Sequence, residues 1–150
     1  MNYTPLTDQD AEVLRHAISA SDRLYVEGIH EVGGALRTIT GEIFSAIHFE
    51  IPSGAVGVCG EIAAVCCMVA AGHRKPAVIT GVWRDPAGQH FLLPPCGRCR
   101  EAIADFNPEA WVIVSTAADH WHPSGIEKPA KVRITDLLPL KSHQLKWPGT

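Results

Sequence analysis

The chain has 150 residues, of which 46% are hydrophobic and 19% are charged, and its net charge is −3. These values fit one globular domain over residues 1–150 and exclude a disordered chain. With only 13 lysine and arginine residues, the chain carries no basic footprint for a nucleic acid polymer, so we expect a small-molecule partner.

The first residues show no charged-then-apolar leader, and no apolar run reaches the roughly 18 residues that a membrane span needs. Five cysteines in such a chain are typical of a reducing compartment. We therefore expect a cytoplasmic protein that does not contact the membrane.

Helices and strands alternate along the first half of the chain. Thr7 is a candidate N-cap for a helix from residue 8 to about 21. Two strands, 32–39 and 42–49, are expected to pair as a hairpin. The helix predicted over 60–71 is apolar almost all round, which predicts that it is buried.

The second half continues the alternation. Its predicted elements are a strand over 76–83, a turn at 85–88, a helix over 96–106, an apolar strand over 111–115 and a last strand near Val132. Residues 117–130 are predicted to form an enlarged surface loop. The order predicts an α/β fold, a three-layer α/β/α sandwich whose mixed sheet has about five strands.

Three cysteines and a glutamate form the motif with the clearest chemistry. Cys59 is followed two places later by Glu61, and Cys96 and Cys99 belong to a Pro-Cys-x-x-Cys run. Three protein ligands on a tetrahedral Zn²⁺ leave the fourth position for water, which then loses its proton near neutral pH. Glu61 is too close to Cys59 to bind the same ion comfortably, so it is the candidate proton shuttle.

Other interpretations of these residues remain open. The cysteines could be buried packing residues, a redox Cys-x-x-Cys pair, or a closed four-cysteine site that recruits Cys66 or Cys67. Cys66 lies about 10 Å along the helix from Cys59, too far to share an ion, so we expect both extra cysteines to pack in the core. Glu61 could be only a helix N-terminal acid.

This motif set, with a non-ligating glutamate between the cysteines, is that of zinc nucleobase deaminases. A cysteine as first ligand makes the chain resemble the cytidine deaminase and blasticidin S deaminase families, over roughly residues 30 to 139. The Ile-Thr-Asp-Leu-Leu-Pro run at 134–139 resembles a short helix that both families share. The resemblance implies a cytidine deaminase-like fold, a Zn²⁺ cofactor and a homo-oligomer, usually a tetramer.

The resemblance also implies three substrate-binding positions. Cytidine deaminases carry Asn-x-Glu upstream of the zinc cysteine to hold the ribose, and His48 and Glu50 stand at those positions here. His30 stands where that family keeps a stacking phenylalanine. Each histidine could donate to a substrate oxygen or be a satisfied, partly buried side chain, and Glu50 could be a solvated acid at a strand end.

Three thiolates leave a zinc site negatively charged, and cytidine deaminases often offset this with an arginine where this chain has Ile62. Arg98 or Arg100 could compensate, or both could be ordinary exposed residues. In the resembling families the C-terminal tail can reach a neighbouring subunit's pocket, so Trp147 could close a site across an oligomer or belong to a loosely packed tail. The run at 120–122 is interpreted as surface.

The expected activity is hydrolytic deamination of a cytosine nucleoside or a related aminated heterocycle. Zinc-bound hydroxide would attack the amino-bearing carbon, and Glu61 would carry protons to the ring nitrogen and to the departing ammonia. A blasticidin S-type or other non-cytidine deaminase is the nearest alternative. A non-catalytic, zinc-stabilised binding protein on the same fold is an alternative from another class.

Overall fold

A mixed seven-stranded sheet lies between helices in this computed structural model, which describes residues 1–116 and 125–141. The strand order is β1-β7-β6-β4-β2-β3, and β5 pairs with β4. Among the strands of the described residues, only β4 and β6 run parallel to each other. The strands are β1 (Thr4–Pro5), β2 (Val32–Thr38), β3 (Ile43–Ile47), β4 (Pro76–Arg84), β5 (His90–Leu93), β6 (Trp111–Ser115) and β7 (Pro129–Arg133).

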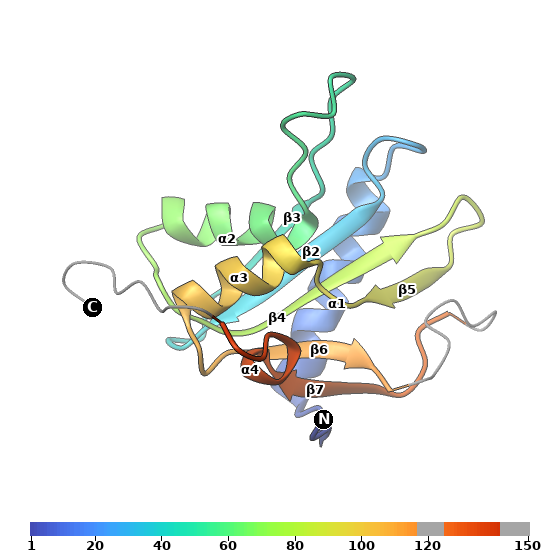
Figure 1. Ribbon diagram of the computed structural model, residues 1–150. Helices are drawn as coiled ribbons and strands as arrows, with labels where there is room; N and C mark the ends of the chain where they lie inside the picture. The colour runs from blue at the N-terminus through green and yellow to red at the C-terminus, as the bar shows by residue number, and fades with distance from the viewer. Residues whose placement is uncertain (117–124, 142–150) are drawn as a thin grey trace.

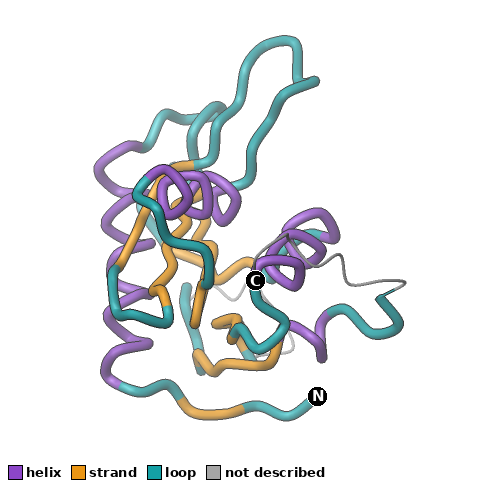
Figure 2. Tube along the Cα trace, turned by 90° about the vertical axis from the view of Figure 1, so that its left-hand side faces the viewer, coloured by secondary structure: helices purple, strands orange, loops and turns teal. Residues whose placement is uncertain are grey.

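The helices cover both faces of this sheet (Figures 1 and 2). One face is packed against α1 (Asp8–Leu24), and the other against α2 (Gly60–Ala70), α3 (Gly97–Phe106) and the short α4 (Ile134–Leu137). Each layer boundary has its own apolar cluster of buried side chains. The predicted three-layer sandwich is therefore confirmed, and so is a mixed sheet.

The strand number was underestimated. The sequence predicted about five strands, whereas the sheet has seven, because β1 and β5 were missed. β1 has two residues and ends at Pro5, and β5 has four residues joined to β4 by the predicted turn, where Gly88 N donates to Asp85 O at 3.0 Å. Strands this short carry too few alternating side chains to give a periodic signal.

The start of α1 follows from its first residues. Thr7 Oγ1 accepts a hydrogen bond from Asp10 N at 3.2 Å, and Asp10 Oδ2 accepts one from Thr7 N at 3.0 Å. This reciprocal pair is a capping box, so the predicted N-cap is confirmed. Asp10 is 1% exposed and also pairs with Lys131 of β7 at 2.6 Å, which ties the helix to the sheet.

The prediction that α2 is buried all round, which was made from its apolar character, is wrong. Only its inner face packs on the sheet, while Cys66 and Cys67 are exposed. Periodicity could not reveal this, because both faces of α2 are apolar and α2 belongs to an outer layer. The expectation that both cysteines pack in the core is therefore wrong.

A loop over residues 48–59 projects from the body of the structure between β3 and α2 (Figures 1 and 2). Its two legs are joined near the body, where Phe49 N donates to Val58 O at 2.9 Å and Val58 N to Phe49 O at 2.8 Å. The predictions for residues 120–122 and for Trp147 fall outside the described residues. No helix in the described ranges has both the length and the apolar character required to cross a bilayer.

Candidate metal centre

The three predicted ligands converge at the N-termini of two helices. Cys59 is the N-cap of α2 and Cys96 is the N-cap of α3, while Cys99 lies in the first turn of α3. The Sγ atoms of Cys59 and Cys96 are 3.6 Å apart, and those of Cys96 and Cys99 are 3.5 Å apart. Two helix N-termini face the sulfurs, and the partial positive charge of a helix N-terminus acts to lower the pKa of a nearby thiol.

The geometry fits a tetrahedral zinc ion. Zn–S bonds of about 2.3 Å place two sulfurs of a tetrahedral site roughly 3.8 Å apart, close to the two separations seen here. All three ligand atoms lie within 4.8 Å of one another, and these cysteines form the metal-binding group found in the described ranges. The site extends from exposed Cys96 to buried Cys99, so its outer side is open to solvent.

The negative charges of the cysteine cluster and Glu61 would be stabilised by a bound cation. Burial raises the pKa of Cys99, and the negative charges of Glu61 and Cys59 raise it further. Burial acts in the same direction on Cys96, but hydrogen bonds from the Cys99 backbone and from the neighbouring thiols outweigh it and lower the pKa of Cys96. A divalent ion among the sulfurs relieves this crowding of negative charge.

Glu61 lies behind the sulfurs rather than among them. Its side chain is buried, with the residue only 5% exposed, and its Oε2 atom accepts a hydrogen bond from Cys99 Sγ at 3.8 Å. Burial raises the pKa of this carboxyl above its ordinary value. The carboxylate is beside the cluster and is not one of its three ligands, which is the arrangement that a proton shuttle needs.

Gly81 of β4 provides the room for this carboxylate. A Cβ atom added to Gly81 would lie 3.0 Å from both Cδ and Oε1 of Glu61. This contact could not be predicted from the sequence, since it depends on which residue of β4 passes beneath the start of α2.

The two arginines left open by the sequence have different roles. Arg98 Nη2 lies 3.6 Å from Cys59 Sγ and donates to Gly57 O at 2.8 Å. A hydrogen bond to Cys59 and the charge of that sulfur raise the pKa of Arg98. Arg100 instead donates to the carbonyls of Pro95 and Leu137, so it joins α3 to α4. Arg98 is the positive charge beside the sulfurs.

The three predicted substrate residues also lie together. His30 Nδ1 is 2.9 Å from His48 O, and His48 Nε2 is 3.5 Å from Glu50 Oε2. His48 Nδ1 is buried and has no hydrogen-bond partner among the residues that the structure describes. Because Phe49 pairs with Val58, this group lies beside the leg of the loop that leads into Cys59.

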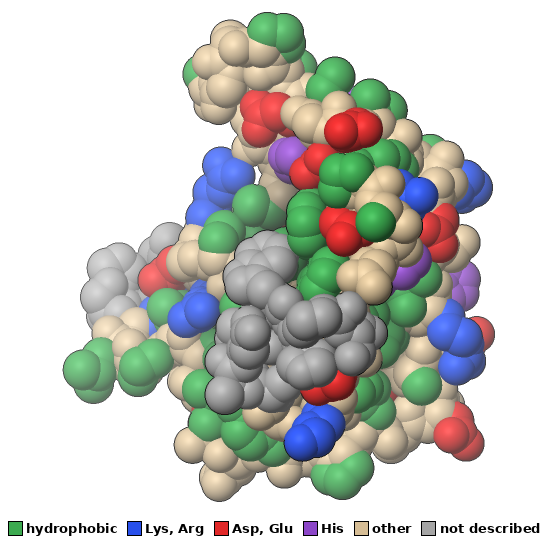
Figure 3. All heavy atoms as spheres, turned by 90° about the vertical axis from the view of Figure 1, so that its right-hand side faces the viewer, with side chains coloured by type: hydrophobic (Ala, Val, Ile, Leu, Met, Phe, Trp, Pro, Cys, Tyr) green, Lys and Arg blue, Asp and Glu red, His purple; other side chains and the backbone are tan. Residues whose placement is uncertain are grey.

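The side of the molecule shown in Figure 3 mixes charges of both signs. Lysine and arginine side chains are scattered among acidic and apolar ones on this face and form no continuous patch.

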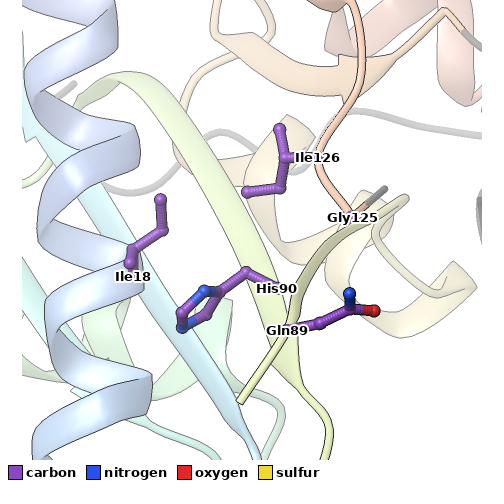
Figure 4. Close-up of a pocket in the computed structure, with 5 residues that line it drawn as sticks. All are labelled: Ile18, Gln89, His90, Gly125 and Ile126. Carbon is purple, nitrogen blue, oxygen red and sulfur yellow. The ribbon is translucent and has the colours of Figure 1, made fainter. Parts of the chain in front are cut away.

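A separate hollow lies on the other side of the sheet, beside α1 (Figure 4). Its volume is about 340 Å³, and it is lined by Ile18, Gln89, His90, Gly125 and Ile126. His90 Nε2 is already paired with Asp22 Oδ1 at 2.8 Å. Nothing there resembles the metal-binding group, so the cysteine cluster is the candidate site.

Comparison with known proteins gives concordant matches. The family model of the cytidine and deoxycytidylate deaminase zinc-binding region matches residues 7–115, a range that contains all three cysteines and Glu61. Blasticidin-S deaminase of Bacillus cereus is 35% identical over 141 residues, which cover 91% of this chain and 94% of that protein.

Solved structures agree. Cytidine deaminase of Burkholderia pseudomallei is 25% identical, with a TM-score of 0.68 over 89% of this chain and 98% of that one. Cytidine deaminase of Mycobacterium leprae is 23% identical, with a TM-score of 0.67 over 89% and 99% of the two chains. These matches confirm the resemblance and the fold that the motifs predicted.

Proposed function

We propose, from the premise that the chain belongs to the cytidine and deoxycytidylate deaminase zinc-binding family, that it hydrolytically deaminates a cytosine nucleoside or a related aminated heterocycle. The observation that carries this proposal is the buried Glu61 carboxylate beside a three-cysteine cluster with tetrahedral spacing. A structural zinc site would have four protein ligands and would need no carboxylate.

The residues divide the reaction between them. Cys59, Cys96 and Cys99 would hold the Zn²⁺, which when bound supplies a nucleophilic water at neutral pH. Glu61 accepts a proton from that water, protonates the ring nitrogen and then assists the departure of ammonia. The oxygen of water thus replaces the amino group, and one ammonia leaves for each turnover. The raised pKa of the buried carboxyl suits a group that must both take and return a proton.

Glu50, His48 and His30 would recognise the part of the substrate remote from the reacting carbon. A carboxylate and two imidazoles offer acceptors and donors for hydroxyl or amino groups, such as those of a sugar. The two histidines stand where cytidine deaminases have other residues, and the relative at 35% identity is a blasticidin-S deaminase. A blasticidin S-type substrate is therefore the second candidate.

We also propose that the chain works as a cytoplasmic homo-oligomer, with a tetramer as the first expectation. The support for an oligomer is the outward side of α2, where Cys66, Cys67 and Ala70 are exposed and Ile62 and Val69 are partly exposed. An apolar helix face of this kind fits an interface between copies of the chain. Size-exclusion chromatography with light scattering measures the assembly.

The function is tested by ammonia release from cytidine, deoxycytidine, cytosine and blasticidin S, with wild-type protein and with Glu61→Gln. Glutamine keeps the shape of the side chain but cannot shuttle protons, a role worth about 10²- to 10⁴-fold. We expect zinc content to stay at the wild-type level while turnover falls by that factor. Unchanged turnover in Glu61→Gln would refute the mechanism. A zinc-loaded wild type that is silent on every compound would favour the non-catalytic binding protein.

A further inference from the structure

Gly57 lies between the predicted substrate residues and the cysteine cluster. A Cβ atom added to it would be 3.0 Å from Glu50 Oε2 and 3.4 Å from Oε1. Gly57 is not among the glycines with positive φ, so its backbone conformation is open to any residue. Because position 57 has no side chain, the Glu50 carboxylate can occupy this space.

The other side of the same residue contacts the metal centre. Gly57 O accepts a hydrogen bond from Arg98 Nη2 at 2.8 Å, and that nitrogen lies 3.6 Å from Cys59 Sγ. Gly57 is thus in contact with both the carboxylate that would hold the substrate and the guanidinium that faces a metal ligand.

Glu50 is held from other directions as well. Its Oε1 atom accepts a hydrogen bond from Ile51 N at 3.1 Å, and its Oε2 atom lies 3.5 Å from His48 Nε2. The carboxylate therefore rests against the backbone of Gly57 with contacts on two further sides. A methyl group at position 57 would displace the carboxylate by a few tenths of an ångström.

We propose that Gly57 is a positioning residue that sets the distance between the Glu50 carboxylate and the cysteine cluster, and so selects substrates that carry a hydroxylated group at that distance from the reacting ring. This inference rests on the proposed function. It assigns a specificity role to a residue that touches neither the metal ligands' sulfurs nor the reacting atoms. Its effect passes through Glu50.

The first test compares Gly57→Ala with wild type on cytidine and on free cytosine. A displacement of about 1 Å in a positioned group can cost about 10²-fold, so the few tenths of an ångström required here predict roughly a three- to tenfold rise in KM for cytidine. We expect kcat, zinc content and the parameters for cytosine to stay at wild-type values. Ser53→Ala, an exposed change in the same loop, is the matched control and should behave as wild type.

The second test is a double-mutant cycle with Glu50→Ala, in which the rise in KM caused by Gly57→Ala should vanish. Independent sites add to within about 0.3–0.5 kcal/mol, which is about a twofold factor in KM. An additive cycle would therefore overturn the positioning role.

Binding is measured separately by calorimetry with cytidine on zinc-loaded Glu61→Gln protein, where turnover does not interfere. There the Gly57→Ala change should weaken binding by the same factor as it raises KM, and equal affinity would also overturn the inference. A wild type that releases ammonia from none of the compounds overturns the proposed function itself. Wild-type turnover with an additive cycle overturns the role of Gly57 alone.

Discussion

Replacing Gly81 with alanine probes the geometry of Glu61, the proposed proton shuttle. The new methyl carbon would lie 3.0 Å from both Cδ and Oε1 of Glu61, where ordinary contact needs at least 3.4 Å. Glu61 is 5% exposed, so its carboxylate has little freedom to withdraw. Gly81 is paired on both sides, with Gly34 of β2 and Leu93 of β5, so the strand cannot move away either.

The expected magnitudes follow from this crowding. Overpacking of a filled site costs about 1–3 kcal/mol, and at roughly 2–4 °C per kcal/mol for a chain of this size Tm should fall by about 2–12 °C. A carboxylate displaced by about half an ångström should lower kcat roughly tenfold. KM should change little, because Gly81 does not approach the predicted substrate residues.

The assay is steady-state ammonia release with zinc content and thermal unfolding measured on the same preparations. Gly57→Ala serves as the comparison, since it should raise KM and leave kcat alone. If Gly81→Ala keeps wild-type kcat while unfolding earlier, the glycine serves packing only and the reasoning fails. Loss of zinc would show that the strain reaches Cys99 rather than the carboxylate alone.

Three further changes test the surroundings of the site and the fold. Asp10→Ala leaves Lys131 buried without its partner, which should cost about 3–5 kcal/mol and lower Tm by about 6–20 °C in thermal unfolding. Arg98→Gln removes the positive charge beside the sulfurs, so the acid limb of the kcat/KM profile should move to higher pH. Glu42 should stabilise the fold above pH 4.5, because hydrogen bonds from Thr38 and Thr40 lower its pKa to about 2, and this contribution should disappear as the pH falls from 4.5 to 2. Thermal unfolding of wild type and Glu42→Gln across that range measures the loss, which the variant should lack.

Each of these has its own contrary outcome. Asp10→Asn keeps the capping hydrogen bonds without the charge, so wild-type stability in Asp10→Asn with a loss only in Asp10→Ala would point to the capping box rather than the ion pair. Arg100→Gln is matched to Arg98→Gln but should keep the wild-type pH profile, and a shift in both would remove the special role of Arg98. Parallel acid unfolding of wild type and Glu42→Gln would contradict the last prediction.

The metal centre could be predicted from the sequence because its signal is local. Cys96 and Cys99 lie within one helical turn, and Cys59 and Glu61 lie within another, so only the approach of two helix N-termini had to be supplied by the fold. The burial of α2 could not be predicted in the same way. Its apolar residues follow no single face, and which side meets the sheet is decided by packing against β2 and β3.

Contacts between residues that are distant in the chain could not be predicted from the sequence. Arg98 and Arg100 look alike in the sequence. Because they are two positions apart on α3, their side chains point to different sides of the helix, Arg98 toward Cys59 and Arg100 toward Leu137. Gly81 is paired with Gly34 of β2 and with Leu93 of the missed strand β5, and in this register it lies under Glu61. The identities of the side chains were enough to predict the chemistry of the site, whereas the strand register determines which neighbours contact its residues.

The proposed proton shuttle and the proposed substrate-binding carboxylate are each placed against a glycine. Glu61 lies over Gly81, and Glu50 lies over Gly57, so backbone rather than side-chain volume limits the position of both groups. Backbone positions change less readily than side chains when a residue is replaced. His48 contacts the Glu50 carboxylate directly, whereas His30 contacts the backbone oxygen of His48, so His30 is the position where a change of substrate can occur without moving either carboxylate. Differences between relatives that act on cytidine and those that act on blasticidin S should then concentrate at position 30, while a small residue is retained at 57 and 81.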